Sequence, residues 1–331
     1  HYPSNVKEKL NSIILSMAEH HWLFSKNPGH DFTRQHLGKL SFYDTMRLII
    51  SMGKGSTNDE IMDYFNLDPD LIPSQSAFCQ RRRQISLSAF EYLFSEFSSS
   101  FPSTTDKFKD HCILACDGCH VVYATNSDII EDYNKPRLID YKGYNHMHLN
   151  GFVDVISKAF LDVVIQPGQQ PDEREALHSM LDHFTPDDPQ KYIITADRGY
   201  ESYDLLFHCE LKNLGYVFRV KSPSSPKSIL SYYASEFPDD LEEFDVTIKR
   251  FFTDKATNIM KSQSDVYRYI NPSKNTPHFY ELLRKNHSHL YFLQFRVVKI
   301  KTAENTQVIY SRLILYLSLI HISEPTRQAE I

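Results

Sequence analysis

Apolar residues recur every three or four positions in two segments near the start of the chain, residues 4–24 and 41–52. This spacing predicts amphipathic helices. Two further helices are expected where Ser56 and Ser74 open amphipathic stretches, because serine is a preferred helix N-cap. The pair of helices that follows these serines has a layout that resembles a helix-turn-helix.

The pattern changes after residue 105 to short apolar runs typical of strands. The strands are expected at residues 111–115, 146–156, 160–165, 192–196 and 216–220. Amphipathic helices at 172–184 and 201–214 follow the third and the fourth strand. Three strands joined by short loops favour antiparallel pairing, whereas strand–helix–strand connections favour parallel pairing, so we predict a mixed sheet flanked by helices.

Further apolar runs predict strands in the last third of the chain, at 244–252, 264–270, 290–300 and 307–315. They indicate a β-rich insertion or a second layer. Together with a polar linker near residue 105, the pattern predicts an α+β protein with a helical domain at 1–105, a mixed-sheet core at 106–220 and a β-rich part at 221–316.

Composition narrows the classes of protein. The chain has 331 residues, 41% hydrophobic and 24% charged, which are the proportions of a folded protein, and it lacks the long apolar run of a membrane span. The formal net charge of −6 argues against a surface coated with basic residues. Residues 101–200 carry 9 basic and 16 acidic side chains. This local surplus is either a solvated face or a site that holds cations.

Five cysteines are an odd number, which disfavours a disulfide framework. Cys116 to His120 has the C-x-x-C-H spacing of covalent haem attachment, and with Cys112 it could form part of a zinc site. The motif ends an apolar run that we interpret as a buried strand, so the preferred interpretation is that these cysteines are small core residues.

The second helix of the helix-turn-helix-like pair carries Arg81, Arg82 and Arg83. Arginines can contact phosphates and guanine edges of DNA. A run of arginines is more often a solvated helix face, and the sequence leaves both interpretations open.

Two aspartates follow apolar strands of the predicted sheet. Asp117 is expected to close the first strand and Asp197 the fourth. Because these two strands can be neighbours, we expect the carboxylates to lie close enough to share a divalent cation. The alternative is that each aspartate only begins a turn.

With these segments the chain resembles a DDE-type transposase of the insertion sequence four family, whose catalytic core is RNase H-like. The matching segments are His30–Arg34, Met52–Ser56, Ser76–Phe78 with the arginines after it, Cys116–Gly118 and Ala196–Tyr200. The resemblance implies that Asp117 and Asp197 are the first two catalytic acids and bind Mg²⁺ or Mn²⁺. It also implies that residues 221–316 are an insertion before the last core helix. We expect Arg198 to contact DNA together with the arginine run.

The family's third acid is a glutamate on that last helix, preceded by a tyrosine and an arginine, and no segment of this chain shows the pattern. We therefore expect no third acid in the chain and no catalytic activity. If activity were found, a third acid would be sought among Glu210, Glu281 and Glu304. Without the covering helix, the apolar side chains of Leu114, Val217 and Val220 are expected to be partly uncovered.

Leu317–Arg327 looks like the in-frame translation of an adapter used in transposon-based DNA sequencing libraries. We expect residues 317–331 to be an artefactual tail, and Glu324 to be there by accident. An ordinary polar tail is the alternative.

Three functions follow from these observations. The first is a transposase that cleaves transposon-end DNA and transfers the strands, inactive in this copy. The second is a DNA-binding protein without catalysis, and the third an RNase H-like nuclease. The expected partner is double-stranded DNA, bound by a homodimer in a bacterial cytoplasm, in association with the nucleoid and without a membrane.

Overall fold

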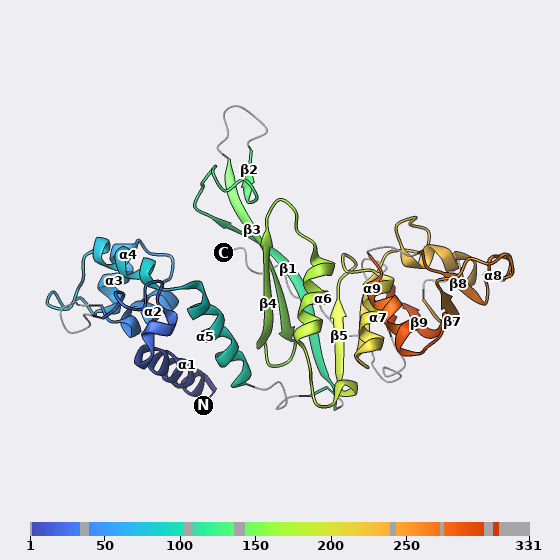
Figure 1. Cartoon of the computed structure of the whole chain (residues 1–331), viewed down its shortest axis with the longest axis horizontal. Helices are drawn as coiled ribbons and strands as arrows, with labels where there is room; N and C mark the ends of the chain where they lie inside the picture. The colour runs from blue at the N-terminus through green and yellow to red at the C-terminus, as the bar shows by residue number, and fades with distance from the viewer. Residues whose placement is uncertain are drawn as a thin grey trace. The chain divides into compact units, whose positions relative to one another are not determined.

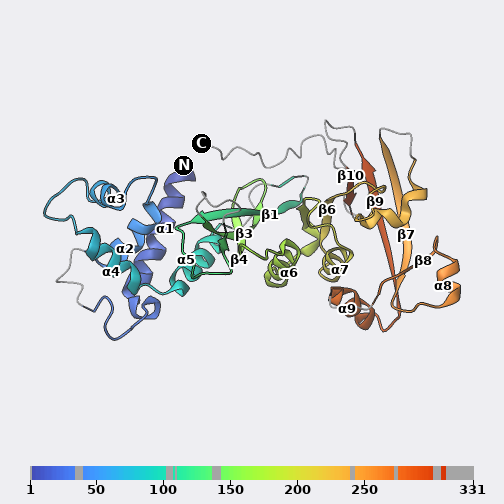
Figure 2. The same cartoon turned by 90° about the horizontal axis from the view of Figure 1, so that it is seen from above.

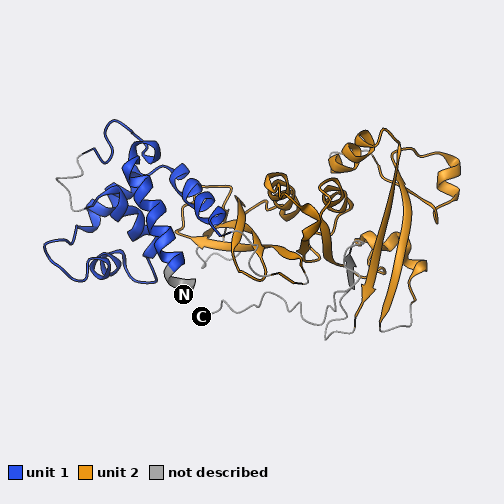
Figure 3. Ribbon diagram, turned by 90° about the horizontal axis from the view of Figure 1, so that it is seen from below, with its two compact units in different colours: residues 1–102 blue, residues 103–331 orange. Residues whose placement is uncertain are grey.

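The protein is described by a computed structural model that divides into two compact units, residues 1–102 and 103–331 (Figure 3). The structure describes residues 2–33, 40–101, 107–108, 110–135, 143–238, 243–271, 275–300 and 307–310. Each unit is described by itself.

The first unit is helical. Its α-helices are α1 (Tyr2–Glu19), α2 (Phe42–Ser51), α3 (Thr57–Tyr64), α4 (Gln75–Gln84) and α5 (Leu87–Ser99), with a 3₁₀ turn at His21–Phe24. The side chains of Ser56 and Ser74 accept hydrogen bonds from the first turns of α3 and α4, as expected of N-caps. Helix α5 was not among the predicted helices. The serines at the end of α5 led to the prediction of a linker there. The signal for a helix was the spacing of Ala89 and Leu93, which lie four residues apart on its buried face.

Two small cores hold these helices together. Helices α1, α2 and α5 enclose Ile14, Phe42 and Ala89, none of which is more than 1% exposed. Ile61 of α3 and Phe78 of α4 pack with Leu48 of α2 in a separate cluster. These contacts fix the α3–α4 pair against α2, so the orientation of α4 is set by burial of Phe78.

The second unit is built on a mixed sheet, which confirms the predicted fold class. The strands of the core are β1 (Cys112–Tyr123), β2 (Tyr133–Asn134), β3 (Tyr144–Asp154), β4 (Phe160–Pro167), β5 (Tyr192–Ala196) and β6 (Gly215–Val220). Strand β3 pairs antiparallel with β1 and β4, whereas β1, β5 and β6 pair in parallel. The sheet order β4-β3-β1-β5-β6 brings the first and fourth predicted strands side by side.

Two helices cover one face of this sheet. Helix α6 (Glu173–His183) connects β4 to β5, and α7 (Tyr203–Leu211) connects β5 to β6. Figures 1 and 2 show both helices on the same side of the strands. Leu177 and Leu206 of the helices join Leu114, Phe152 and Phe218 of the sheet in one core, and each of these side chains is at most 1% exposed. Parallel neighbours with covering helices are the arrangement that strand–helix–strand connections predict.

The later strands extend the same sheet and do not form a second layer. They are β7 (Phe244–Thr253), β8 (Tyr267–Tyr269), β9 (Leu290–Lys299) and β10 (Gln307–Tyr310). Strand β10 joins the two parts because it pairs antiparallel with both β6 and β9. Three helical segments in this region were not predicted: a 3₁₀ segment at Ile229–Glu236, α8 (Asn258–Ser262) and α9 (Pro277–Lys285). A further 3₁₀ turn, Pro189–Lys191, precedes β5.

The expectation of uncovered apolar side chains is wrong for the three residues named. Leu114 is fully buried, and Val217 and Val220 are each only 4% exposed. Leu114 and Val220 belong to the core beneath α6 and α7, and Val217 lies on a strand that is paired on both edges. The expected tail at 317–331 lies outside the described residues. Among the described residues, no helix is long and apolar enough to cross a membrane.

Candidate active site

The two aspartates lie one position beyond the last pair that joins β1 to β5. That pair is Cys116 and Ala196, so Asp117 and Asp197 follow it at matching positions on neighbouring parallel strands. Asp197 ends β5 as predicted, but Asp117 does not end β1. Strand β1 continues to Tyr123 because β3 pairs with it over this whole length, whereas β5 stops at Ala196.

A glycine follows each aspartate closely and fixes its carboxylate. The Gly118 N–H donates to Asp117 Oδ1 at 2.9 Å, and the Gly199 N–H donates to Asp197 Oδ1 at 2.6 Å. Both aspartates remain exposed to solvent. The backbone therefore orients two carboxylates that an ion or a phosphate can still reach.

A third carboxylate, which was not predicted from the sequence, lies at the same place. Glu173 is the first residue of α6, and a β-carbon added to Gly199 would lie 2.8 Å from Glu173 Oε2 and 2.9 Å from Asp197 Oδ1. The two carboxylates therefore face one small space beside Gly199. The sequence does indicate that Glu173 begins a helix, because Asp172 before it is a typical N-cap. In the structure Asp172 caps α6 and so fixes the position of Glu173.

The charge of Asp197 acts on both Asp117 and Glu173. Burial raises the pKa of Asp117, the bond from Gly118 opposes this shift, and the negative charge of Asp197 raises the pKa further. Burial also raises the pKa of Glu173, and the negative charges of Asp197 and then Asp117 add to that shift. A cation bound near these carboxylates would reduce their repulsion.

A buried histidine borders the acids. His148 of β3 is 3% exposed, and its Nε2 lies 3.5 Å from Glu173 Oε1. Neither of its ring nitrogens has a hydrogen-bond partner of good geometry. A β-carbon on Gly118 would lie only 2.4 Å from the same Nε2, so this glycine leaves room for the imidazole. Burial lowers the pKa of His148, which favours the neutral ring with a free lone pair.

The cysteine motif does not form a haem or zinc site. Cys116 is buried and Cys119 is exposed, because residues three apart on a strand point to opposite faces. Cys112 and Cys116 are buried, as expected of small core residues.

Three other histidines gather between α6, α7 and α9. The rings of His178, His208 and His278 lie within 17° of parallel, and one nitrogen from each lies within 4.8 Å of the others. His208 and His278 stack with ring centroids 3.9 Å apart, so their in-plane lone pairs do not converge on one point. The His178 and His208 Nδ1 atoms lie 2.9 Å apart and share a hydrogen bond. We therefore interpret this histidine cluster as a packing contact between α6, α7 and α9.

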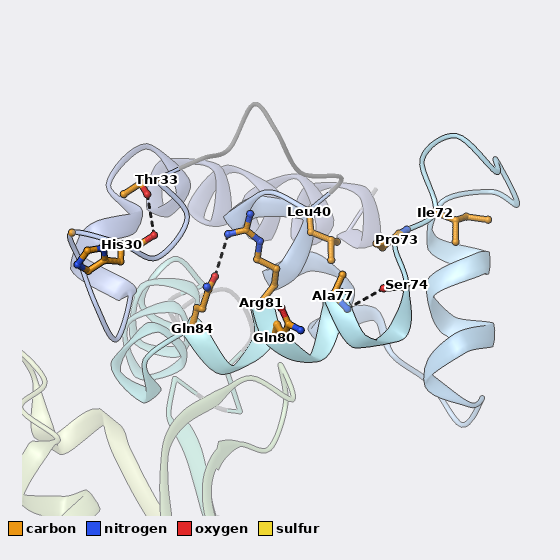
Figure 4. Close-up of a pocket in the computed structure, with 11 residues that line it drawn as sticks. His30, Thr33, Leu40, Ile72, Pro73, Ser74, Ala77, Gln80, Arg81 and Gln84 are labelled. Carbon is orange, nitrogen blue, oxygen red and sulfur yellow. Dashed lines mark hydrogen bonds between the residues drawn. The ribbon is translucent and has the colours of Figure 1, made fainter.

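The arginines of α4 point in different directions. Arg81 is half-buried: its guanidinium lies 5.1 Å from the centre of the Phe32 ring and donates to Gln84 Oε1 at 3.1 Å. Arg82 and Arg83 are exposed. A cavity of about 860 Å³ runs beside the helix, and Figure 4 shows Gln80, Arg81 and Gln84 along its wall. In the second unit, Arg198 is exposed next to Asp197.

The glutamates considered as a third acid have other surroundings. Glu210 accepts hydrogen bonds from the Tyr216 and Tyr291 hydroxyls, at 3.3 and 3.0 Å. Glu281 is exposed on α9. Glu304 lies outside the described residues.

A family model described as a transposase DDE domain matches residues 108–303. No curated protein matches the chain. Among solved structures, the chain is similar to the piggyBac transposase in a synaptic complex with hairpin DNA, with 9% identity and a TM-score of 0.39. That match covers 80% of this chain and 49% of the piggyBac chain, so the present chain spans about half the length of that transposase.

Proposed function

The chain belongs to the transposase DDE domain family, and we propose that it cleaves the DNA ends of a transposable element and joins them to target DNA, with divalent cations held by Asp117 and Asp197. The observation that carries the proposal is the placement of the two aspartates. Each directly follows the last paired residue of the neighbouring parallel strands β1 and β5, and the charge of Asp197 acts on Asp117.

The donor set fits a hard cation. Carboxylate oxygens are the ligands that Mg²⁺ and Mn²⁺ prefer, and the mutual repulsion of the acids is relieved when one binds. Such ions activate an attacking oxygen and stabilise the leaving oxygen in phosphoryl transfer. The protein's own part is to orient the acids through the Gly118 and Gly199 N–H groups and to leave them exposed to a DNA strand.

The first unit supplies a surface for duplex DNA in this proposal. Ser76, Gln80 and Arg83 are exposed and follow one another at helical spacing along α4, and the Gln80 Nε2 atom donates to Ser76 Oγ at 3.4 Å. A polar stripe of this kind fits a phosphate backbone and base edges. Arg198 lies beside Asp197 and fits a contact to the DNA strand near the acids.

The test is cleavage of a labelled duplex that carries the ends of the encoding element, with Mg²⁺, with Mn²⁺ and with a chelator. The missing family glutamate predicts an inactive copy, whereas the paired aspartates predict metal-dependent strand cleavage that Asp117→Asn and Asp197→Asn abolish. Asp188→Asn is the matched control, because Asp188 is an exposed aspartate paired with Lys191 outside the site. Cleavage that persists in Asp117→Asn, or that needs no metal, contradicts the proposal.

The same assay decides the expectation that this copy is inactive. Duplex binding without any cleavage supports the alternative of a DNA-binding protein without catalysis. Cleavage of an RNA–DNA hybrid in preference to the duplex supports the RNase H-like nuclease.

A further inference from the structure

Glu173 has a position that its helix alone does not explain. An acid in the first turn of a helix is stabilised by the helix dipole, and α6 has two such acids, Glu173 and Glu175. Glu175 is exposed, whereas the Glu173 side chain is only 35% exposed and turns toward the strand ends. The helix dipole stabilises Glu173 and Glu175 alike, so it does not explain why only Glu173 points inward.

The space that Glu173 faces is shared with the proposed metal ligands. Glu173 Oε2 and Asp197 Oδ1 both lie within 3 Å of the point where a Gly199 β-carbon would be, at 2.8 and 2.9 Å. The two oxygens are therefore at most 5.7 Å apart (2.8 + 2.9 Å), and rotation of the side chains can bring both to one cation, whose own oxygen contacts are about 2.0–2.6 Å long.

Backbone conformation does not explain why residue 199 is a glycine. Gly199 does not have the positive φ that would require glycine. A side chain at this position would occupy the space between the two carboxylates, so the lack of one keeps that space open.

An independent observation points to the same space from the other side. His148 is buried from β3, its ring nitrogens have no well-formed hydrogen bond, and Nε2 lies 3.5 Å from Glu173 Oε1. A buried polar ring that makes no well-formed hydrogen bond is costly unless something else binds or polarises it. An ion held by Glu173 would place positive charge near this buried ring.

We propose that Glu173 is a third carboxylate ligand of the cation held by Asp117 and Asp197, and that it thereby supplies a catalytic acid from the start of α6. This inference rests on the proposed function, since it concerns the same ion. The third acid would then lie between the two aspartates in the sequence, on helix α6.

The experiment measures Mn²⁺ binding to the whole chain without DNA, by electron paramagnetic resonance of the free ion. Glu173→Gln removes the charge and keeps the shape of the side chain, and Glu175→Gln is the matched control on the same turn. We expect Glu173→Gln to weaken Mn²⁺ binding by about tenfold or more, since even outer-sphere partners of metal sites are worth 10–100-fold. Glu175→Gln should bind as the unaltered protein does.

A second variant guards against a folding effect. Glu173→Asp keeps the charge but withdraws the carboxylate by one methylene, so its affinity should fall between those of Glu173→Gln and the unaltered protein. Equal thermal unfolding temperatures of the three proteins without metal would show that the fold is retained. If Glu173→Gln lowers that temperature while Glu173→Asp does not restore Mn²⁺ binding, the residue is structural and the proposal is overturned.

The failure of this inference is distinguishable from that of the proposed function. If Asp197→Asn weakens Mn²⁺ binding and Glu173→Gln does not, Glu173 is not a ligand and the two-aspartate site stands. If the unaltered protein binds no Mn²⁺ at millimolar concentration, both fail.

Discussion

Asp117 and Asp197 lie one residue past the Cys116–Ala196 pair, which joins the neighbouring parallel strands β1 and β5. Strands in a sheet are about 4.8 Å apart, so side chains at matching positions on one side share their surroundings. This explains why the charge of Asp197 raises the pKa of Asp117. The register of β1 and β5 therefore assembles two acids that are 80 positions apart in the sequence.

Gly199→Ala should damage the site more than the fold. The new β-carbon would lie 2.8 Å from Glu173 Oε2 and 2.9 Å from Asp197 Oδ1, so both carboxylates must shift. Such displacements cost catalysis about 100-fold, and we expect a comparable loss of DNA cleavage. The free energy of unfolding should change by less than about 1 kcal/mol, because flexible side-chain ends can move aside. Gly29→Ala, with no atom within 4 Å of its β-carbon, is the control for stability.

Arg81 and Arg83 should respond differently to substitution by alanine. Arg83 is exposed, so Arg83→Ala should lower the slope of log affinity against log salt by about 0.9, because one phosphate is no longer neutralised. Arg81→Ala should chiefly lower the unfolding temperature, because the side chain packs on Phe32 and bonds Gln84. Fluorescence anisotropy at several salt concentrations, beside thermal unfolding, checks both. If the salt slope of Arg83→Ala is unchanged, Arg83 does not contact a phosphate and is only a solvated side chain.

Acid should destabilise the second unit through the histidine cluster. Burial lowers the pKa of His178 to about 4 and that of His208 to about 2, and the neighbouring rings, His278 first, add to both shifts. The folded pKa lies below the unfolded value of about 6.5, so the unfolded chain binds the extra protons. Stability is therefore full above that value and falls as the pH drops toward 4.

The expected slope is about 1.4 kcal/mol per pH unit for each histidine that only the unfolded chain protonates. The groups facing the rings are Asp204, Asp182, Asp172 and Lys212. Urea unfolding between pH 7.5 and 5 measures the slope, and His178→Gln should flatten it. A slope that is the same in His178→Gln would show that this histidine is not responsible.

Asp204→Ala should loosen α9. Asp204 is buried at the start of α7 and accepts hydrogen bonds from the His278 and Phe279 N–H groups, at 3.1 and 3.3 Å. His278 Nδ1 lies 2.6 Å from its other oxygen. Loss of the carboxylate leaves buried donors unpaired and should cost about 2–3 kcal/mol of unfolding free energy in a urea titration. Asp188→Ala, at an exposed ion pair, should cost less than about 1 kcal/mol.

Periodicity predicted most of the sheet because buried strands read as apolar runs wherever helices cover them. The expected strand at 192–196 is β5 itself, and that at 160–165 lies within β4. Strand β1 was predicted too short because past Asp117 residues on both of its faces, such as Cys119 and Val122, are exposed, and the pattern of a buried strand ends there. Helix α9 was missed because its nine residues depend on Asp204 for their N-terminal hydrogen bonds, a contact between distant parts of the sequence.

The site was predicted in part for a similar reason. Asp117 and Asp197 were found because each follows an apolar strand, which is a local signal. Glu173 was missed because its helix start shows only a capped helix, and its meeting with Asp197 depends on how α6 crosses the sheet. The arginine run gave no sign that Arg81 packs on Phe32, since 49 positions separate the two.

The most direct test of the proposed metal site is a crystal structure of the chain grown with Mn²⁺, with anomalous diffraction recorded to locate the ion. We expect an anomalous peak within about 2.0–2.6 Å of carboxylate oxygens of both Asp117 and Asp197. Two carboxylates more than about 10 Å apart, or no peak between them at millimolar Mn²⁺, would contradict the shared site.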